Sequence, residues 1–406
     1  MKVVHVTPHL GGGMGKALSV ISKALPRKEV DQKFILLEKP VNKRYLKEIV
    51  ATGAVVSVAE NLEELAQWCK EADIVQFEFV NHPKIFECLA RTPFAPMRSV
   101  VWCHISGLFK PYIQPELINQ ASRFVFSSKV SHQSPTWSNL ADKGRAKTAV
   151  INSGFGLSEA ITVARPKHGA QPVIGYLGTV NFVKMHRGFF RVIDMLERDV
   201  KAKIWGIPDK SVVKLVKQMV HQDRFEFLGE TPVPAVALSE VDVFFYPLQR
   251  THYGTGENAL VEAMSMGLPV VVLGNPAEVE IVDHLKTGMV AQTMDDALRY
   301  VQYLMATPLL RRHMGNNAAT WVKKNRAPQS AADAFMNLWN ELLYEAPSQP
   351  DFRQTVGHTP IEWYKSTQAL DGAIEVDQPE AEGPTKGSLK HFEKVFKDDP
   401  SFAQLV

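Results

Sequence analysis

The chain has 406 residues, 45% hydrophobic and 22% charged, which is the composition of a soluble globular protein. This length predicts two domains. No apolar run reaches the length of a transmembrane helix, and the N-terminus lacks the basic region and cleavage site of a signal peptide. Cys69, Cys88 and Cys103 lack the spacing of a metal site, so we expect reduced thiols in a cytoplasmic protein.

The formal net charge of +3 is unevenly distributed along the chain. Residues 1–165 carry 21 Lys and Arg against 14 Asp and Glu, whereas residues 346–406 carry 6 against 10. A basic first half favours an anionic partner, such as a lipid-linked intermediate, a phosphorylated metabolite or nucleic acid, and leaves peripheral membrane contact open. A solvated basic face without a partner explains the same counts equally well.

Short apolar strands alternate with helix-period segments from the N-terminus onward. The expected strands of the first half are VVHV, KFILLE, AVVSVA, DIVQFEF, SVVWCHI, RFVFSS and TAVIN. This βαβ alternation predicts a parallel, doubly wound sheet, and hence a Rossmann-like domain over residues 1–165. The polar, breaker-rich stretch TVARPKHGAQP, residues 162–172, predicts a linker.

The alternation restarts after the linker with PVIGYLG, AKIWGI, FEFLGE, VDVFFYPL, LPVVVLG and TGMVAQ. We therefore expect a second Rossmann-like domain over residues 171–328, followed by a closing helix over residues 329–345. Residues 346–406 contain few large apolar side chains, which predicts a flexible acidic tail. Phe392, Phe396 and Phe402 could dock a short terminal helix, but we expect a frayed end.

The stretch HLGGGMGKAL, residues 9–18, joins the first expected strand to a helix. No hydroxyl residue follows Lys16, which excludes a P-loop, and the spacing does not fit the dinucleotide pattern G-x-G-x-x-G. Gly12, Gly13 and Gly15 still let the backbone approach a ligand at a helix N-terminus. Lys16 opposes the helix dipole unless it faces a diphosphate or an anionic acceptor. The alternatives are a plain strand-to-helix connection and a lysine that points to water.

The most informative segment is HYGTGENALVEAMSMGLPVVVLG, residues 252–274. Gly254 and Gly256 precede a predicted helix, where bare amides and the helix dipole bind anions. Thr255 is placed to cap that helix or to contact a phosphate. Glu262, on the same helix, could accept hydrogen bonds from a ribose diol. Together these residues predict a nucleotide-diphosphate site at the carboxyl ends of parallel strands.

This segment resembles the donor-binding signature of the family-4 glycosyltransferases, a retaining group with the GT-B architecture of two Rossmann-like domains facing a cleft. Their pattern is Glu, seven residues, Glu, then Ala-Met-Ala-x-Gly-x-Pro-Val-Val. Glu262 matches the second glutamate, whereas Gly254 stands where the first is expected. Glu257 would partly substitute for it, as in a variant subgroup of the form HYGT-x-E-x-x-L-x-E-A.

The resemblance extends over most of residues 1–345 and implies further site residues. Lys184 stands at the position of the lysine that grips the donor diphosphate. Thr179 stands where an arginine is usual, so one phosphate cation is missing, and His186 or Arg187 would compensate. The closing helix is expected to pack back on the first domain, as in relatives.

The strands that match those of the family imply three further parts of the site. His104 ends the strand whose terminal histidine faces the sugar in the family. Gly206 lies near the nucleobase, and the loop of Leu228, Gly229 and Glu230 brackets that base. Further candidates at the exits of the second-half strands are Arg250, His252, Tyr253 and Glu280.

The function implied is transfer of a sugar from a nucleotide-diphosphate sugar with retention of configuration. The chain contains no Asp-x-Asp, which disfavours the metal-dependent fold with that motif and leads us to expect no cofactor or metal. Lys184 and the loop amides would stabilise the departing diphosphate, with His104 and Glu257 as the other catalytic candidates. Donor binding is expected on residues 171–328, and acceptor binding on the first domain, at Lys16.

Other functions remain open at this stage. A nucleotide-sugar epimerase or a sugar phosphorylase of similar architecture, and a non-catalytic nucleotide-sugar binder, fit the same motifs. A plain NAD dehydrogenase is disfavoured because the glycine loop lacks the dinucleotide pattern and the acidic residue that follows it. The sequence identifies neither the donor base and sugar nor the acceptor.

Overall fold

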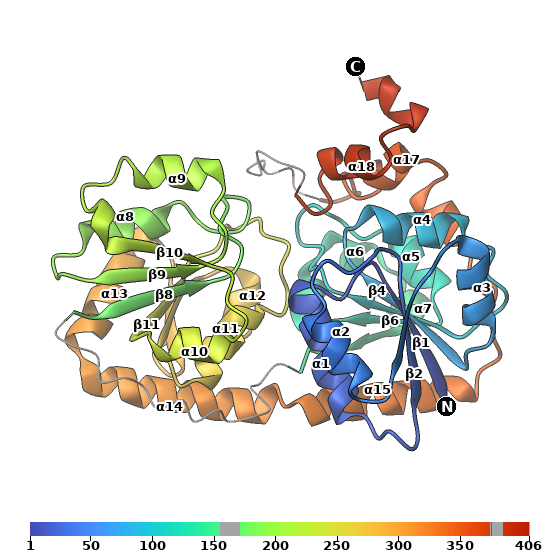
Figure 1. Ribbon diagram of the computed structural model, residues 1–406, viewed down its shortest axis with the longest axis horizontal. Helices are drawn as coiled ribbons and strands as arrows, with labels where there is room; N and C mark the ends of the chain where they lie inside the picture. Colours follow the sequence, from blue (N-terminus) through green and yellow to red (C-terminus); the bar gives the residue numbers. More distant parts are fainter. Residues whose placement is uncertain (155–170, 374, 376–384, 406) are drawn as a thin grey trace.

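The computed structural model describes residues 1–154, 171–373, 375 and 385–405 of the chain. Two α/β domains lie side by side, each built on a parallel sheet with helices on both faces (Figure 1). The predicted fold class of two tandem Rossmann-like domains is therefore confirmed. The predicted linker, residues 162–172, lies almost entirely outside the described residues.

The first domain contains a seven-stranded sheet in the order β3-β2-β1-β4-β5-β6-β7, with every neighbouring pair parallel. Each strand coincides with an apolar run expected from the sequence, because strands buried on both faces are apolar throughout. The strands are β1 (Lys2–Thr7), β2 (Asp31–Leu36), β3 (Val55–Val58), β4 (Ile74–Phe79), β5 (Ser99–Cys103), β6 (Arg123–Phe126) and β7 (Thr148–Val150). The helices are α1 (Gly12–Ala24), α2 (Arg44–Val50), α3 (Leu62–Lys70), α4 (Pro83–Arg91), α5 (Pro115–Gln120), α6 (Pro135–Asn139) and α7 (Asp142–Arg145), with a 3₁₀ turn η1 (Lys129–Gln133).

The second domain contains a six-stranded parallel sheet in the order β10-β9-β8-β11-β12-β13. Its strands also coincide with the expected runs: β8 (Val173–Leu177), β9 (Lys201–Trp205), β10 (Phe225–Gly229), β11 (Val243–Tyr246), β12 (Val270–Leu273) and β13 (Gly288–Ala291). The helices are α8 (Gly188–Met195), α9 (Lys210–Val216), α10 (Pro234–Ser239), α11 (Asn258–Ser265), α12 (Pro276–Val279), α13 (Met294–Ala306) and α14 (Pro308–Asn325), with η2 (Gln222–Arg224).

Strand order reverses once in each sheet. In the first domain β1 lies between β2 and β4, and in the second β8 lies between β9 and β11. Helices that leave neighbouring strands toward opposite faces open a crevice at the carboxyl ends of those strands, where α/β proteins bind ligands. The loops that carry the predicted site residues therefore meet at these two crevices.

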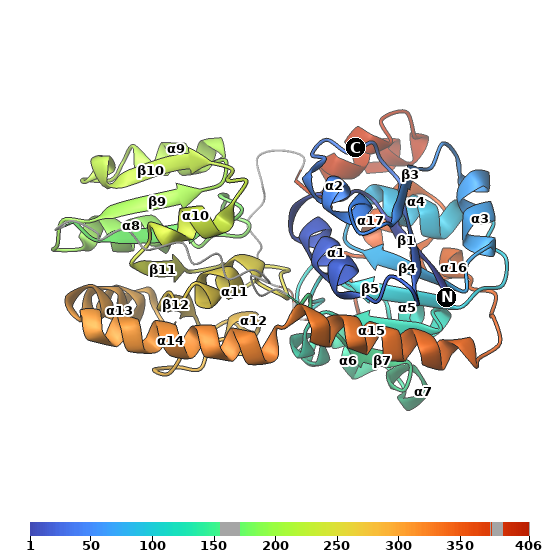
Figure 2. The same ribbon diagram turned by 60° about the horizontal axis from the view of Figure 1, so that its bottom comes forward.

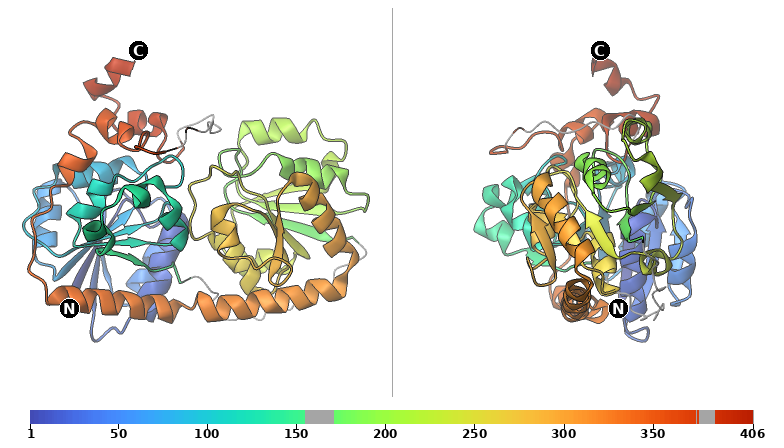
Figure 3. Two further views of the ribbon diagram at one scale, coloured as in Figure 1. Left: turned by 180° about the vertical axis from the view of Figure 1, so that it is seen from behind. Right: turned by 90° about the vertical axis from the view of Figure 1, so that its left-hand side faces the viewer.

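A long helical path connects the domains. α14 lies against the second domain, and α15 (Pro328–Leu343) continues beneath the first (Figures 2 and 3). The fully buried Trp339 of α15 donates a hydrogen bond from Nε1 to Gln76 Oε1 in β4, at 3.1 Å. Phe335 packs edge-on against Trp102 of β5. The closing helix is thus part of the first domain's core.

The segment after α15 differs from the flexible tail expected for residues 346–406. It forms α16 (Phe352–Val356), α17 (Pro360–Lys365), α18 (Leu389–Val395) and η3 (Pro400–Leu405), and the first three pack against α4 (Figure 1). Phe352, Trp363 and Phe392 are buried. Large apolar side chains are few here, but their spacing places each one on the same face of the first domain. Residues 374, 376–384 and 406 lie outside the described part.

Replacing Phe392 by Ala should detach the C-terminal segment from α4. The ring is fully buried, and removing such a ring costs about 3–5 kcal/mol. We expect faster amide hydrogen exchange in α17 and α18, with little change in β4 and β5. The exposed Lys397→Ala on the same segment serves as the control, and equal exchange in both variants would contradict the docking described here.

Candidate active site

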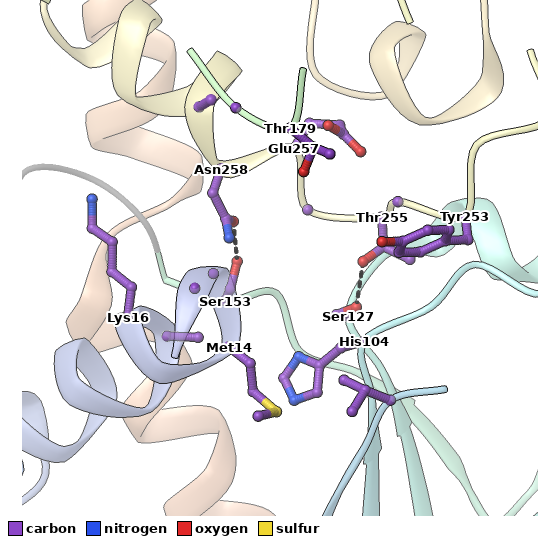
Figure 4. Close-up of a pocket in the computed structure, with 18 of the residues that line it drawn as sticks. Met14, Lys16, His104, Ser127, Ser153, Thr179, Tyr253, Thr255, Glu257 and Asn258 are labelled. Carbon is purple, nitrogen blue, oxygen red and sulfur yellow. Dashed lines mark hydrogen bonds between the residues drawn. The ribbon is translucent and has the colours of Figure 1, made fainter. Parts of the chain in front are cut away.

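A cavity of about 390 Å³ lies between the two domains (Figure 4). Most of the predicted site residues line it, together with side chains that the sequence did not single out, such as Asn81 and Tyr246. The predicted residues that line the cavity are Gly12, Gly13, Lys16, His104, Thr179, Lys184, Tyr253, Gly254, Thr255, Gly256, Glu257 and Glu262. Loops from both sheets therefore converge on one site.

Three predicted donor residues do not line this cavity. A Cβ at Gly15 would lie 2.3 Å from the Leu10 carbonyl oxygen, so this glycine lets the loop pack against its own helix. Gly206 has a φ of +145° and lies against Gly178. Leu228 is 45% exposed, outside the cavity. The role at the nucleobase expected for Gly206 and Leu228 has no counterpart in the cavity lining.

Other candidates also lie outside the cavity lining. Arg250 is exposed, and Arg187 stacks on the Phe182 ring, 4.6 Å from its centroid. His186 accepts a hydrogen bond at Nδ1 from the Gly188 amide, 3.0 Å away. His186 and Arg187 thus lie outside the cavity lining, and their compensation for the missing phosphate cation stays a prediction.

The N-termini of α1 and α11 meet at the cavity. α1 begins after Gly11, and α11 after Glu257, and neither has a side-chain cap. A Cβ at Gly13 would lie 2.5 Å from Asn258 Nδ2, so a larger residue here would displace the Asn258 side chain. Two uncapped helix N-termini with bare backbone N–H groups favour an anion between them.

An ion pair joins these two helices across the domains. Lys16 Nζ in α1 contacts Glu262 Oε1 in α11, and both side chains are largely buried. The sequence predicts an anion opposite Lys16, and in this structure that anion is the carboxylate expected to hold the ribose. A ribose at Glu262 would therefore share or replace the contact with Lys16.

A second ion pair lies within the second domain. Lys184 Nζ contacts both Glu257 carboxylate oxygens, at 2.9 and 3.0 Å, and Tyr246 donates its hydroxyl to Oε2 at 3.0 Å. Burial raises the pKa of Glu257, but the positive charge of Lys184 and the hydrogen bonds from Lys184 and Tyr246 outweigh it, so the pKa lies below its ordinary value. Burial likewise lowers the pKa of Lys184, but the Glu257 charge outweighs it and raises the pKa. Both groups are charged at neutral pH.

Glu257 reaches this position through an unusual backbone conformation. Its φ of +36° and ψ of +59° lie in the left-handed region, which costs a residue other than glycine about 1–3 kcal/mol. The carboxylate thereby folds over Gly254, where an added Cβ would lie 1.9 Å from Glu257 Oε1. The Glu257 carboxylate thus fills the space that a side chain at position 254 would take.

His252 forms hydrogen bonds that hold the loop containing Gly254. Its Nδ1 accepts a hydrogen bond from the Gly254 amide at 3.1 Å, so the ring proton lies on Nε2. Nε2 then donates to Oε2 of the fully buried Glu278, 3.3 Å away. Glu278 was not predicted, because nothing in the stretch NPAEVEIVDHL, residues 275–285, distinguishes it from the acidic residues Glu280 and Asp283.

On the first domain, His104 follows β5 and lies at the cavity (Figure 4). Its Nε2 lies 3.0 Å from Glu78 Oε2, and His5 Nδ1 lies 3.1 Å from Oε1 of the same carboxylate. Burial raises the pKa of Glu78, but hydrogen bonds from His104 and His5 outweigh it and lower the pKa. Glu78, which sequence analysis missed, therefore fixes the orientation of the His104 ring.

Polar contacts also connect the domains around the cavity. Ser127 and Thr255 hydroxyls lie 2.8 Å apart, and Ser153 Oγ donates to Asn258 Oδ1 at 3.3 Å (Figure 4). Glu280, a candidate for a cation or sugar contact, instead accepts hydrogen bonds from the first turn of η1, including the Val130 amide at 2.9 Å. Thr255 and Glu280 hold the two domains together in this structure.

Comparison with protein families finds a match in the second domain. Residues 158–321 match the family model "Glycosyl transferases group 1". This part of the chain is therefore similar to the domain that this model describes. Over 80 residues the chain is 29% identical to "Glycosyltransferase 1 domain-containing protein 1" of Xenopus tropicalis, a match that covers 20% of this chain and 23% of the relative's length.

Solved structures share the fold at low identity. HepE from Anabaena, in complex with UDP and glucose, is 17% identical and has a TM-score of 0.66, over 84% of this chain and 100% of its own. TarM from S. aureus, in complex with fondaparinux, alpha-GlcNAc-glycerol and UDP, is 11% identical with a TM-score of 0.69, over the same shares. The fold is the GT-B architecture of glycosyltransferases.

Replacing Glu257 by Gln should destabilise the second domain, because Lys184 stays buried without an anion. Breaking a largely buried ion pair costs about 3 kcal/mol or more. The effect should be full above pH 4.5 and vanish as the pH falls through the lowered pKa of Glu257, where the wild-type carboxylate is neutralised too. Urea unfolding at several pH values measures the difference.

The matched control for this variant is the double substitution Glu257→Gln with Lys184→Met. Removing both charges should recover part of the lost stability, because no uncompensated charge remains. If Glu257→Gln unfolds like the wild type at pH 7, the pair has no structural role.

Proposed function

We propose that this protein is a retaining glycosyltransferase that moves a sugar from a nucleotide-diphosphate sugar to an acceptor without a metal ion. The observation that carries the proposal is the cavity between the domains, where two uncapped helix N-termini and Lys184 converge. The match of residues 158–321 to the group 1 family model supports it. UDP complexes of proteins with the same fold support a nucleotide donor.

The donor would bind mainly to the second domain. The amides of Gly254, Thr255 and Gly256 and the N-terminus of α11 suit its diphosphate, with Lys184 beside them. Glu262 would accept hydrogen bonds from the ribose diol. Gly12 and Gly13 of the first domain approach the same phosphates from the opposite side of the cavity. The glycine loops thus form two halves of one phosphate site.

The proposed chemistry relies on stabilising the leaving group. As the bond from the anomeric carbon to the diphosphate breaks, negative charge develops on the phosphate oxygen, where Lys184 and the helix N-termini stabilise it. The acceptor hydroxyl attacks the same face of the sugar and passes its proton to the departing oxygen. Glu257 is already paired with Lys184 and Tyr246, so it is better suited to positioning than to nucleophilic attack. His104 would orient the sugar.

A screen of nucleotides tests the donor site directly. UDP, GDP, ADP and TDP and their sugars are each added to the full chain, and thermal stability is measured. We expect at least one to raise the melting temperature, because a ligand bound to the folded state stabilises it. If none does, the donor site is wrongly assigned.

Product analysis then separates the reaction classes. A transferase releases the nucleoside diphosphate only slowly until an acceptor is added, an epimerase releases it without one, and a phosphorylase requires inorganic phosphate. A non-catalytic binder shows binding and no release. The anomeric configuration of the product, followed by NMR, tests retention, and undiminished turnover in EDTA tests metal independence.

Glu262→Ala should weaken nucleoside diphosphate binding about ten-fold, because the ribose loses charge-assisted hydrogen bonds. Lys16→Met is the matched control, since it breaks the same ion pair but keeps the carboxylate. Affinity measured by calorimetry should fall only in Glu262→Ala. Equal losses in both variants would assign the effect to the ion pair and remove the ribose role.

Gly254→Ala should displace the Glu257 carboxylate, because the added Cβ would lie 1.9 Å from Oε1 in the present arrangement. We expect sugar transfer to fall at least ten-fold, by loss of the positioned carboxylate. Gly53→Ala, at a glycine outside the cavity lining with open space at its Cβ position and a φ of +90°, controls for the backbone strain of a glycine replacement away from the site. Unchanged transfer in Gly254→Ala would show that Glu257 plays no part.

A further inference from the structure

The segment that follows the closing helix returns to the cavity. Lys386 lines it beside Val80 and Asn81, which follow β4 of the first domain. Asn81 Nδ2 donates a hydrogen bond to the Gly387 carbonyl oxygen at 3.1 Å. Gly387 has a φ of +78°, and its missing side chain permits this contact, since a Cβ would lie 2.1 Å from Asn81 Nδ2. The contact between Gly387 and Asn81 thus places Lys386 next to the carboxyl end of β4.

The position of Lys386 is fixed by a packed helix rather than by a loose end. The Gly387 amide donates to His391 Nδ1 at 3.0 Å, and α18 follows directly. Phe392 of α18 is fully buried, with its ring 5.8 Å from Phe86 of α4 and 5.7 Å from Tyr364 of α17. Lys386 therefore belongs to a built surface of the first domain.

Lys386 differs from the other two lysines of the cavity. Lys16 is paired with Glu262, and Lys184 with Glu257. Among the residues that the structure describes, no acceptor lies within hydrogen-bond distance of Lys386 Nζ, and no carboxylate within ion-pair distance. The cavity thus holds one ammonium group that the protein does not neutralise by direct contact.

The surroundings of Lys386 disfavour its charge. The side chain is exposed at the cavity, and desolvation by the surrounding protein lowers its pKa to about 8, with a smaller opposing effect from Glu38. His9 and His82 lie nearby, and burial lowers their pKa values to about 4 and about 2, so both are neutral at pH 7. His391 has a pKa lowered in the same way. An anion bound to Lys386 would relieve an unfavourable charge.

We propose that Lys386 binds a phosphate group of the acceptor, so that the C-terminal segment determines acceptor specificity. This inference rests on the proposed function, because the proposed function places the donor on the opposite side of the cavity. A phosphate suits the site since lysine acts as a compact point charge, whereas planar carboxylates favour the fork of arginine. The excess of basic residues in the first domain attracts such an acceptor.

Binding of a phosphate probe to the nucleotide-saturated protein tests the proposal. The donor site is filled with the nucleoside diphosphate found in the screen above, and inorganic phosphate or glycerol 3-phosphate is titrated by calorimetry. Lys386→Met should weaken binding of either probe about ten-fold or more, and Lys386→Arg should retain part of it. Lys390→Met, an exposed lysine of α18, should bind like the wild type.

The pH dependence gives a second readout. Lys386 loses its charge as the pH rises through about 8, so phosphate binding should weaken between pH 7 and pH 9 in the wild type and not in Lys386→Arg. His9, His82 and His391 lie near Lys386, and their pKa values are lowered from 6.5, away from this window; Glu38, whose pKa burial raises, is the other titratable group beside it.

The outcomes separate the two proposals. Nucleotide binding without phosphate binding, or equal phosphate binding by the wild type and Lys386→Met, overturns the acceptor site and leaves the proposed function intact. Failure of every nucleotide to bind overturns the proposed function instead. A transfer assay then compares two pairs of acceptors, glycerol with glycerol 3-phosphate and glucose with glucose 6-phosphate, to identify the molecule that carries the phosphate. In Lys386→Met, KM should rise for the phosphorylated acceptor of each pair and stay unchanged for the other.

Discussion

The buried ion pair between Lys184 and Glu257 is the constraint on which the candidate site depends. Two full charges are held in a protein interior, and the geometry compensates their desolvation with two short contacts and a hydrogen bond from Tyr246. The same pair holds Glu257 in a left-handed conformation at the start of α11. The direction of α11, and hence the position of Glu262, follows from it. One interaction thus sets the phosphate loop and the ribose carboxylate together.

The contacts between the domains at the cavity are of a different kind. They include ion pairs and hydrogen bonds, such as Lys16 with Glu262 and Ser127 with Thr255, beside the packing of Tyr253 against the first domain. Polar contacts can be exchanged for water or for ligand groups at small cost, whereas a packed apolar surface cannot. α15, buried against the first domain, keeps the domains connected during such exchange. The architecture therefore allows the cavity to open and close around a donor without losing either core.

The sequence predicted the fold well because its signals were local. Each of the thirteen strands is a short apolar run between helix-period segments, and parallel pairing follows from that alternation. The glycine loop before α11 was predicted to lie at the carboxyl ends of parallel strands, and the family resemblance implied that Lys184 lies beside the donor diphosphate. Residues whose role depends on distant partners were missed, such as Glu78 beneath His104 and Tyr246 on Glu257. No local pattern reports those contacts.

The C-terminal segment was mispredicted for a related reason. Composition measures how much apolar surface a segment carries, and residues 346–406 carry little. Docking depends instead on where that surface lies, and three aromatic residues spaced along the segment suffice to cover one face of the first domain, beside α4. A segment that cannot form a hydrophobic core of its own can still complete the core of the domain against which it packs.

The charges around the cavity show why that segment matters. Its lining lysines are Lys16, Lys184 and Lys386, and its lining carboxylates are Glu257 and Glu262. Four of these groups form two internal pairs, so among the described lining residues the excess positive charge is that of Lys386. In the proposed function, helix N-termini and Lys184 of the two-domain core bind the donor diphosphate. The remaining charge comes from the C-terminal segment, on the side of the first domain, where we propose that the acceptor binds. On these two proposals, donor chemistry and acceptor choice are encoded in separate parts of the chain, and the second can change while the first is kept.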